Sequence, residues 1–265
     1  MSELLRLEVT PPIARIKIDR LSLKNAFNQA MWELLPRLLE QCVCAPETRV
    51  IILQSSAAGA FSSGADISEF SSHAADPDWM AANQAAIRRA QRDLARAAKP
   101  TVALVEGTCV GGGCGLAMAC DIRLASAAAK FGIPAAKLGL SYSVHDTKLL
   151  VDLVGPSQAK RLLFGGQLIP AAEALRIGLV DVVAEDAATE ATALASAIAA
   201  VSPSAVTVIK TVIREILDGQ VDDDARTRRR FEAAFTAEDF KEGVAAFLEK
   251  RPARFQALRR NAPVE

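Results

Sequence analysis

Hydrophobic and polar residues follow two different periods along this chain. Residues 4–9 and 13–18 alternate apolar and polar positions, which predicts two strands on either side of the Pro11–Pro12 turn. Short apolar runs predict further strands at residues 50–53, 101–105, 122–125 and 179–183. Helical spacing predicts helices in the intervening segments, at residues 29–43, 77–98, 113–120, 156–164 and 171–177.

The order of these segments indicates the fold class. Strands alternate with helices as far as residue 188, and the remaining pattern is wholly helical. Alternation of this kind is typical of an α/β core. We therefore predict an α/β fold that ends in a purely helical region.

Composition and charge exclude several classes of protein. Of the 265 residues, 51% are hydrophobic and 23% charged, which predicts a folded core. The formal net charge is zero, which argues against nucleic acid as a partner. The longest apolar runs are too short to span a membrane.

The cysteines and the N-terminus favour a cytoplasmic protein without a metal site. There are five cysteines, no Cys-x-x-Cys pair and only two histidines, so a zinc site has few candidate ligands. We interpret the cysteines as reduced. Residues 1–8 lack the basic start and apolar stretch of a secretory signal.

Two turns rich in small residues are candidates for a site. They cover residues 60–67 and 105–115, and each precedes a predicted helix or helical segment. Small residues let a ligand approach the backbone, and the first N–H groups of a helix have no internal acceptor. Two such N–H groups aimed at one point would hold a developing oxyanion. The alternative is that the glycines only allow tight turns and close helix packing.

Other glycine motifs do not fit the second turn. A dinucleotide fingerprint would need a glycine where Leu116 stands. A phosphate-binding P-loop would need a lysine where Cys114 stands.

The same turns, together with motifs before and after them, resemble the enoyl-CoA hydratase/isomerase (crotonase) superfamily. The resemblance runs in order along nearly the whole chain. Its motifs are Lys24-Asn25-Ala26-Phe27-Asn28, Lys99-Pro100, Asp121-Ile122, Phe131-Gly132-Ile133-Pro134, Leu138-Gly139, the segment 171–180 and the segment 242–251.

The resemblance implies a fold and an assembly. It implies a crotonase-like spiral of β-β-α turns over residues 1–200. Residues 201–265 would then form a C-terminal helical region that mediates trimerisation, as a homotrimer or a dimer of trimers.

The resemblance also implies a ligand, an acyl-CoA thioester, with coenzyme A as part of the substrate and no separate cofactor. By match, the backbone N–H groups of Ala65 and Gly112 would bind the thioester carbonyl, and Gly111 would line the same turn. Lys24, and Lys250 of a neighbouring subunit, would bind the CoA phosphates, unless both are ordinary solvated charges. Ser63 and Asp66 would lie along the adenine and pantetheine, unless Asp66 caps the following helix.

The sequence departs from the family where hydratases carry two glutamates that place and activate water. Those positions are Gly115 and Ala135, which would line the substrate site but cannot move a proton. A positioned acid or base contributes about 10²–10⁴-fold to a rate. Conventional hydration is therefore disfavoured, and so is isomerisation that depends on the second glutamate.

The segment 140–147 is predicted to be a loop and holds Tyr142 and His145. Some decarboxylases of the superfamily carry a tyrosine at the place of Tyr142, although they have a histidine where this chain has Ala65. Tyr142 would hydrogen-bond a departing carboxylate or supply the final proton. Alternatively, its hydroxyl donates to a backbone carbonyl. His145 either lines the pocket or points away, and its side chain and that of Asp146 can point apart.

Two functions remain open from the sequence. The first is an enzyme that stabilises a thioester enolate, either by decarboxylating a carboxyacyl-CoA or as a weak hydratase or isomerase that uses Tyr142 or Glu69. The second is a non-catalytic acyl-CoA-binding oligomer. His73, in a polar segment, is predicted to lie at the surface.

Overall fold

The computed structural model describes residues 4–256 and contains two β-sheets. The larger sheet has six strands in the order β1-β2-β3-β5-β7-β10. All its neighbours are parallel except β1 and β2. Its strands are β1 (Leu5–Thr10), β2 (Ile13–Ile18), β3 (Val50–Ser55), β5 (Thr101–Val105), β7 (Ile122–Ser126) and β10 (Val182–Ala184). Because helices cover both faces, the central strands are near-continuous apolar runs.

The smaller sheet brings distant turns of the chain together. Its order is β4-β6-β8-β9, with β4, β6 and β8 parallel and β9 antiparallel. These strands are β4 (Ala60–Ser62), β6 (Thr108–Val110), β8 (Lys130–Gly132) and β9 (Ile169–Pro170). Since parallel neighbours end at the same edge, the turns that follow β4 and β6 lie next to each other. These are the two small-residue turns of the sequence.

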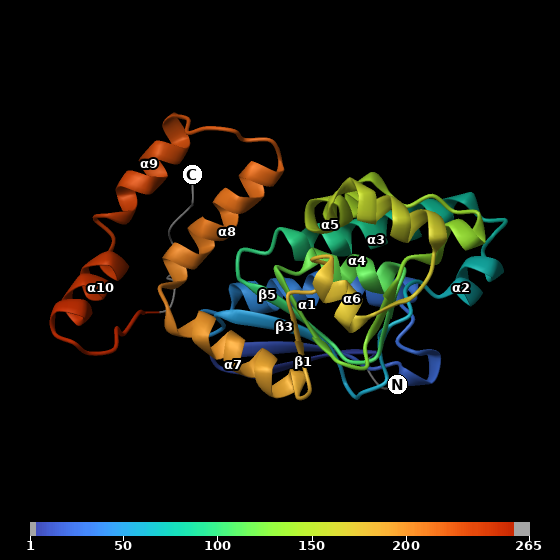
Figure 1. Cartoon of the computed structure of the whole chain (residues 1–265), viewed down its shortest axis with the longest axis horizontal. Coiled ribbons are helices and arrows are strands. Elements are labelled where there is room, and N and C mark those ends of the chain that lie inside the picture. Colours follow the sequence, from blue (N-terminus) through green and yellow to red (C-terminus); the bar gives the residue numbers. More distant parts are fainter. Residues whose placement is uncertain (1–3, 257–265) are drawn as a thin grey trace.

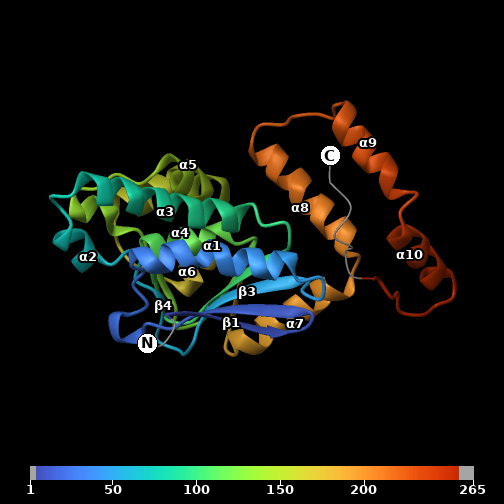
Figure 2. The ribbon, with the colours of Figure 1, turned by 180° about the vertical axis from the view of Figure 1, so that it is seen from behind.

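Helices cover the six-stranded sheet on both faces (Figures 1 and 2). One face carries α1 (Gln29–Cys44), α3 (Pro77–Ala95), α4 (Gly112–Ala119) and α5 (Val144–Gly165), and the other carries α7 (Ala187–Ala200). Asn28 caps α1 by accepting from the Met31 N–H, which explains where that helix begins. Shorter helical segments connect these layers: η1 (Leu21–Leu23), α2 (Ile67–Ser72), η2 (Pro134–Leu138) and α6 (Ala171–Arg176).

The last three helices stand apart from these layers (Figure 1). They are α8 (Pro203–Leu217), α9 (Ala225–Ala234) and α10 (Glu238–Leu248), and we call them the C-terminal arm. The start of α8 is tied to α10, because the Ser202 and Ser204 hydroxyls both donate to Asp239, at 2.6 and 2.5 Å. The arm therefore holds together as a unit at one side of the core.

The predicted α/β fold is confirmed, with local differences. The strand predicted at residues 179–183 is observed as β10, which begins only at Val182. The segment 140–147 is not entirely a loop, since α5 begins at Val144. The Ser143 side chain accepts from the Asp146 N–H and caps this helix, a signal present in the sequence. Gly155, at φ 72°, interrupts α5 before the predicted start at residue 156.

Two further predictions concern the extent of the chain. The division at residue 200 stays a prediction, and its last part, residues 257–265, lies outside the described residues. Within residues 4–256, no single helix has the length and apolar character to cross a bilayer; α7 and α8 reach that threshold only together, across a bend of 107°.

Candidate functional site

The two small-residue turns meet at the segment that precedes α1. The Phe27 N–H donates to the Gly64 carbonyl at 2.7 Å, and the Asp66 N–H donates to the Phe27 carbonyl at 2.9 Å. This bridge holds the backbone on both sides of Ala65. The first turn is therefore fixed by residues about forty positions earlier in the chain.

The backbone of Ala65 lies beside that of Gly112. A Cβ placed on Gly112 would lie 3.5 Å from the Ala65 nitrogen, and one placed on Gly64 would lie 2.8 Å from the Gly112 nitrogen. Gly64 also has φ 92°, so both its backbone conformation and its surroundings require glycine. The two amides predicted to bind one oxygen are thus neighbours.

Both N–H groups are available to a ligand. Within the described residues, neither the Ala65 N–H nor the Gly112 N–H donates to an acceptor of the chain. Both residues are partly exposed. Gly112 is the first residue of α4, where the partial positive charge of the helix adds to that of the N–H. The arrangement can hold an anion or a polarised carbonyl oxygen.

The indole of Trp32 forms a wall of this site. The ring is fully buried, and two of its carbons lie 3.3 Å from the position of a Cβ on Gly112. It also packs against Phe27, with ring centroids 4.5 Å apart. Trp32 was not predicted as part of the site, although an aromatic residue four positions after the Asn28 cap is visible in the sequence.

Two polar side chains occupy the space beside Gly115, one from α3 and one from the segment that precedes α5. A Cβ on Gly115 would collide with the end of the Gln91 amide and would lie 3.3 Å from the Tyr142 hydroxyl. Gln91 comes from α3 and is buried. With its amide nitrogen turned toward Asp146, Gln91 donates to the two carboxylate oxygens at 2.9 and 3.2 Å. Sequence reasoning missed Gln91, because its burial depends on which face of α3 packs inward.

The Tyr142 hydroxyl donates to the Gly111 carbonyl at 3.1 Å. The alternative that it finds a backbone carbonyl is therefore confirmed. Burial raises the pKa of Tyr142 well above 10, and the nearby Asp146 carboxylate raises it further, so the phenol stays protonated. The Nδ1 atom of His145 is 3.3 Å from a carboxylate oxygen of Asp146, so these two side chains do not point apart. Asp146 is buried and His145 partly exposed.

The second position without a glutamate, Ala135, lies in η2. It is partly exposed, and its carbonyl accepts from the Leu140 N–H at 3.0 Å. Its side chain packs against the main core. No group at this position can transfer a proton.

The predicted CoA-binding residues divide into two groups. Lys24 and Ser63 lie together, since the Ser63 N–H donates to the Lys24 carbonyl at 2.9 Å. Lys24 is exposed and Ser63 partly so. Asp66 is engaged elsewhere, because it caps α2 and pairs with Arg20 at 2.7 Å. Its role as a helix cap is confirmed, and its role toward substrate stays a prediction.

The remaining candidates are more distant or otherwise engaged. The Glu69 carboxylate accepts from the Gln29 N–H at 2.8 Å, at the start of α1. His73 is partly exposed and stacks on Trp79, with ring centroids 4.3 Å apart. Lys250 is exposed and follows the end of α10 in the C-terminal arm. Within residues 4–256, no cluster of His, Cys, Asp and Glu side chains is arranged to hold a metal ion.

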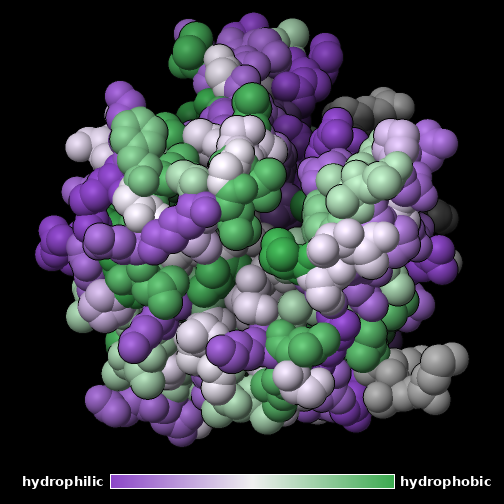
Figure 3. Space-filling model, turned by 90° about the vertical axis from the view of Figure 1, so that its right-hand side faces the viewer, coloured by the Kyte–Doolittle hydropathy of each residue, from purple (hydrophilic) through white to green (hydrophobic). Residues whose placement is uncertain are grey.

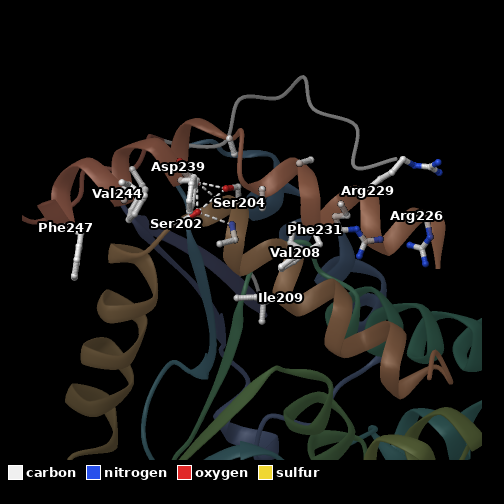
Figure 4. Close-up of a pocket in the computed structure, with 18 of the residues that line it drawn as sticks. Ser202, Ser204, Val208, Ile209, Arg226, Arg229, Phe231, Asp239, Val244 and Phe247 are labelled. Atoms are coloured by element: carbon white, nitrogen blue, oxygen red, sulfur yellow. Dashed lines mark hydrogen bonds between the residues drawn. The ribbon is translucent and has the colours of Figure 1, made fainter. Parts of the chain in front are cut away.

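Two cavities lie elsewhere, at the C-terminal arm. One, of about 1170 Å³, lies between α8 and the two following helices, and we call it the C-terminal groove (Figure 4). It is lined mainly by apolar side chains, which include Val208, Ile209, Phe231, Phe240, Val244 and Phe247. A second, of about 470 Å³, separates α8 from the core. Neither is lined by Ala65 or Gly112, and we place the chemistry at the turns because these two N–H groups lie side by side without an acceptor in the described residues.

The end of the molecule that carries α2 shows a mixed surface. Figure 3 views this face, on which hydrophobic residues gather in patches between hydrophilic ones. The segment around the start of α5 exposes three apolar side chains, those of Leu138, Leu140 and Val144. They are close to Tyr142 and His145 in the chain.

Comparisons with known proteins identify the family and support the fold. Residues 8–258 match the family model described as enoyl-CoA hydratase/isomerase. A solved structure of an enoyl-CoA hydratase/isomerase family protein from Hyphomonas neptunium is 39% identical, with a TM-score of 0.94 over 97% of this chain and 99% of that one. The short-chain-enoyl-CoA hydratase of Clostridium acetobutylicum is 35% identical over 92% of this chain and 94% of its own. The crotonyl-CoA hydratase of Syntrophomonas wolfei is 34% identical over 94% and 96%.

Proposed function

Because the chain belongs to the enoyl-CoA hydratase/isomerase family, we propose that it binds an acyl-CoA thioester and stabilises the enolate of the acyl group. The backbone N–H groups of Ala65 and Gly112 hold the thioester oxygen. Coenzyme A arrives as part of the substrate, and no separate cofactor takes part. The single observation that carries this proposal is the pair of adjacent N–H groups without an acceptor in the described chain.

The proposed role of the backbone has a simple physical basis. Negative charge that develops on the thioester oxygen meets two fixed donors and the positive end of α4. Removal of one donor of this kind from an enzyme costs about 10²–10³-fold in turnover. Lys24, beside Ser63 at the edge of the first turn, is suited to a CoA phosphate.

The reaction we favour needs no base. Gly115 and Ala135 carry no acid or base, and the amide that fills the space beside Gly115 cannot transfer a proton. Conventional hydration is therefore disfavoured. Loss of CO₂ from a carboxyacyl-CoA leaves the bonding electrons as an enolate, which the two N–H groups would stabilise. Decarboxylation is the first reaction to test, with His145 as the partly exposed candidate for the final proton.

A non-catalytic acyl-CoA-binding oligomer is the second candidate. The observation that favours it is that the polar side chains beside Gly115 are engaged with the protein. The Tyr142 hydroxyl donates to Gly111, and Gln91 donates to Asp146. In that case the thioester would bind with its carbonyl polarised, and no bond would break.

We further propose that the protein is a trimer, alone or as a dimer of trimers, in the cytoplasm. The apolar C-terminal groove supports self-association, because the Phe247 side chain at its edge is 83% exposed in the single chain. A neighbour seated there is the source of the Lys250 that we assign to the CoA phosphates. All five cysteines are free, which supports a reducing compartment.

A pair of variants at Gly112 tests the N–H role. Gly112→Pro removes the donor at the first position of a helix, where proline is tolerated, and Gly112→Ala keeps the donor while adding the same Cβ. Both Cβ atoms meet the Trp32 ring at 3.3 Å, so the two variants share that contact and differ at the nitrogen, where proline carries Cδ in place of the hydrogen. We expect proline to lower methylmalonyl-CoA decarboxylation about 10²–10³-fold relative to alanine.

The measurement is CO₂ release and absorbance with methylmalonyl-CoA and crotonyl-CoA, with calorimetry for binding. Equal activity of the proline and alanine variants would contradict the N–H role. Binding without turnover of either thioester would favour the non-catalytic oligomer. Crotonyl-CoA hydration at rates typical of enzymes, about 1–10³ s⁻¹, would refute the importance of the two missing glutamates.

A further inference from the structure

The Tyr142 hydroxyl contacts the peptide group that supplies one of the two proposed donors. The Gly111 carbonyl and the Gly112 N–H belong to a single planar peptide unit, so the direction of one fixes the direction of the other. The Tyr142 hydroxyl donates to that carbonyl at 3.1 Å, and the Gly115 N–H donates to it at 3.1 Å. The Tyr142 side chain thus holds the carbonyl end of this peptide unit, and the N–H end of the same unit faces the site.

We propose that Tyr142 is a positioning residue that orients the Gly111–Gly112 peptide and strengthens its N–H as a donor to the thioester oxygen. This inference rests on the proposed function. It replaces the prediction that Tyr142 delivers a proton, because its hydroxyl proton is given to the Gly111 carbonyl. A hydrogen bond accepted by a carbonyl polarises the peptide, and the N–H on the other side becomes a better donor.

The backbone at this peptide needs such support. Gly111 has φ 55° and ψ −120°, outside the conformations that most residues adopt, and it caps α4 without a side chain. The Gly111 N–H donates to the Gly132 carbonyl at 2.9 Å, which fixes the preceding peptide. Tyr142, which lies outside α4, restrains the next peptide, Gly111–Gly112, by donating to its carbonyl.

The surroundings of Tyr142 keep its hydroxyl in place and protonated. Asp146, in the first turn of α5, accepts from Gln91 of α3 at 2.9 and 3.2 Å, which ties the start of α5 to the core. Burial raises the pKa of Tyr142, so the hydroxyl remains a donor throughout the neutral range. The position of the Tyr142 hydroxyl and its protonation state therefore both suit a donor to the Gly111 carbonyl.

The absent side chain at Gly115 belongs to the same arrangement. A Cβ there would lie 3.3 Å from the Tyr142 oxygen and would displace the Gln91 amide. A longer side chain at this position would compete for the space in which the tyrosine and the glutamine now lie. Glycine at position 115 thus leaves the space that the Tyr142 hydroxyl and the Gln91 amide occupy.

Two ligands separate the polarising role of Tyr142 from a structural one. One is 2,4-hexadienoyl-CoA, whose absorption moves to longer wavelength when its carbonyl is polarised. The other is the matching CoA thioether, which lacks the carbonyl oxygen. The ratio of their Kd values measures the hydrogen bonds to the carbonyl alone. We expect Tyr142→Phe to lower the preference for the thioester about 2- to 10-fold and to reduce the wavelength shift.

A control and a second measurement complete the test. Ser143→Ala removes the cap of α5 and leaves the hydrogen bond from Tyr142 to the Gly111–Gly112 peptide in place. We expect this variant to keep the wild-type ratio of the Kd values for thioester and thioether. Because Tyr142 is the only tyrosine, 3-fluorotyrosine incorporated throughout the protein labels this site alone. The fluorinated phenol is a stronger donor, so we expect a larger wavelength shift, and a ¹⁹F signal that moves more with the thioester than with the thioether.

The outcomes are distinct. A wild type that binds neither ligand, or both equally, would refute the proposed function itself. A wild type that prefers the thioester, with the same preference in Tyr142→Phe and after fluorination, would overturn the inference alone. If Tyr142→Phe does not fold, the fluorinated protein decides the matter by itself.

Discussion

The core and the C-terminal arm are held together by different forces. In the core, strands β3 and β5 bury nearly every side chain between two layers of helices. In the arm, within the described residues, α8 has no fully buried side chain, and α9 and α10 have one each, Thr227 and Ala246. The arm relies instead on ionic contacts, such as Glu215 with Arg226 and Arg230.

Each region therefore obtains its stability from a different source. Apolar burial, at about 25 cal/mol per Å², makes the core self-sufficient. Ion pairs near the surface contribute little each, about 0–1 kcal/mol, while the aromatic side chains of the arm remain uncovered. The exposed aromatic side chains of the arm are therefore consistent with the proposed self-association, whereas the core, which holds Ala65 and Gly112, buries its own apolar side chains.

The largest expected effect is in the core. Leu53 is 1% exposed in the centre of β3, so Leu53→Ala should lower the free energy of unfolding by about 2–5 kcal/mol. Phe247→Ala, in the arm, should change it by no more than about 0.5 kcal/mol at concentrations low enough to separate the subunits. Urea denaturation of both variants measures the difference. Similar losses in the two variants would break the comparison.

The next effect concerns association. Phe247→Asp places a charge at the edge of the C-terminal groove and should weaken association by about 2 kcal/mol, which is roughly 30-fold. Val221→Asp is a matched control, because Val221 is 97% exposed in the connection between α8 and α9 and does not line the groove. Sedimentation velocity across a dilution series gives the result. If Val221→Asp dissociates the protein as readily, the groove is not the interface.

The smallest effect is a dependence of the arm on pH. Hydrogen bonds from Arg230 and then Arg226 lower the pKa of Glu215 from its ordinary value of 4.5 to about 2. Because the folded pKa is depressed, this contribution is complete above about pH 4.5 and is lost as the pH falls toward 2. It amounts to at most about 1 kcal/mol.

Amide exchange can isolate that effect. At each pH, we compare α8 and α9 amides in the wild type and in Glu215→Gln, so that intrinsic exchange rates cancel. The wild type should be better protected at pH 6, and the two proteins should converge toward pH 2. Exchange in β3 should be the same in both. A constant difference across this range would argue against titration of Glu215.

Local signals in the sequence predicted much of the fold. Four features lie close to their predicted positions: the Asn28 cap, the strands that begin at Val50 and Thr101, and the helix that begins at Pro77. They depend on periodicity and capping within a few residues, which a sequence displays directly. The start of α5 was missed, because the apolar Val144 is 87% exposed and gives no amphipathic pattern there.

The site was only partly predictable. The family motifs pointed to Ala65, Gly112 and the positions without glutamates. They did not reveal Gln91, because the contact of α3 with α5 joins residues more than fifty positions apart. Nor did they tell whether Tyr142 faces a ligand or the backbone, since that depends on where the hydroxyl lies relative to Gly111.

The position of Trp32 gives the protein an optical reporter. Its indole lies 3.3 Å from the Cβ position of Gly112, and the chain has only one other tryptophan, Trp79, stacked on His73 at the surface. A negative charge or a conjugated thioester beside Gly112 would alter the emission of the buried indole and leave that of the surface indole unchanged. Occupancy of the site can therefore be followed by intrinsic fluorescence, without any label, from the first mixing experiment.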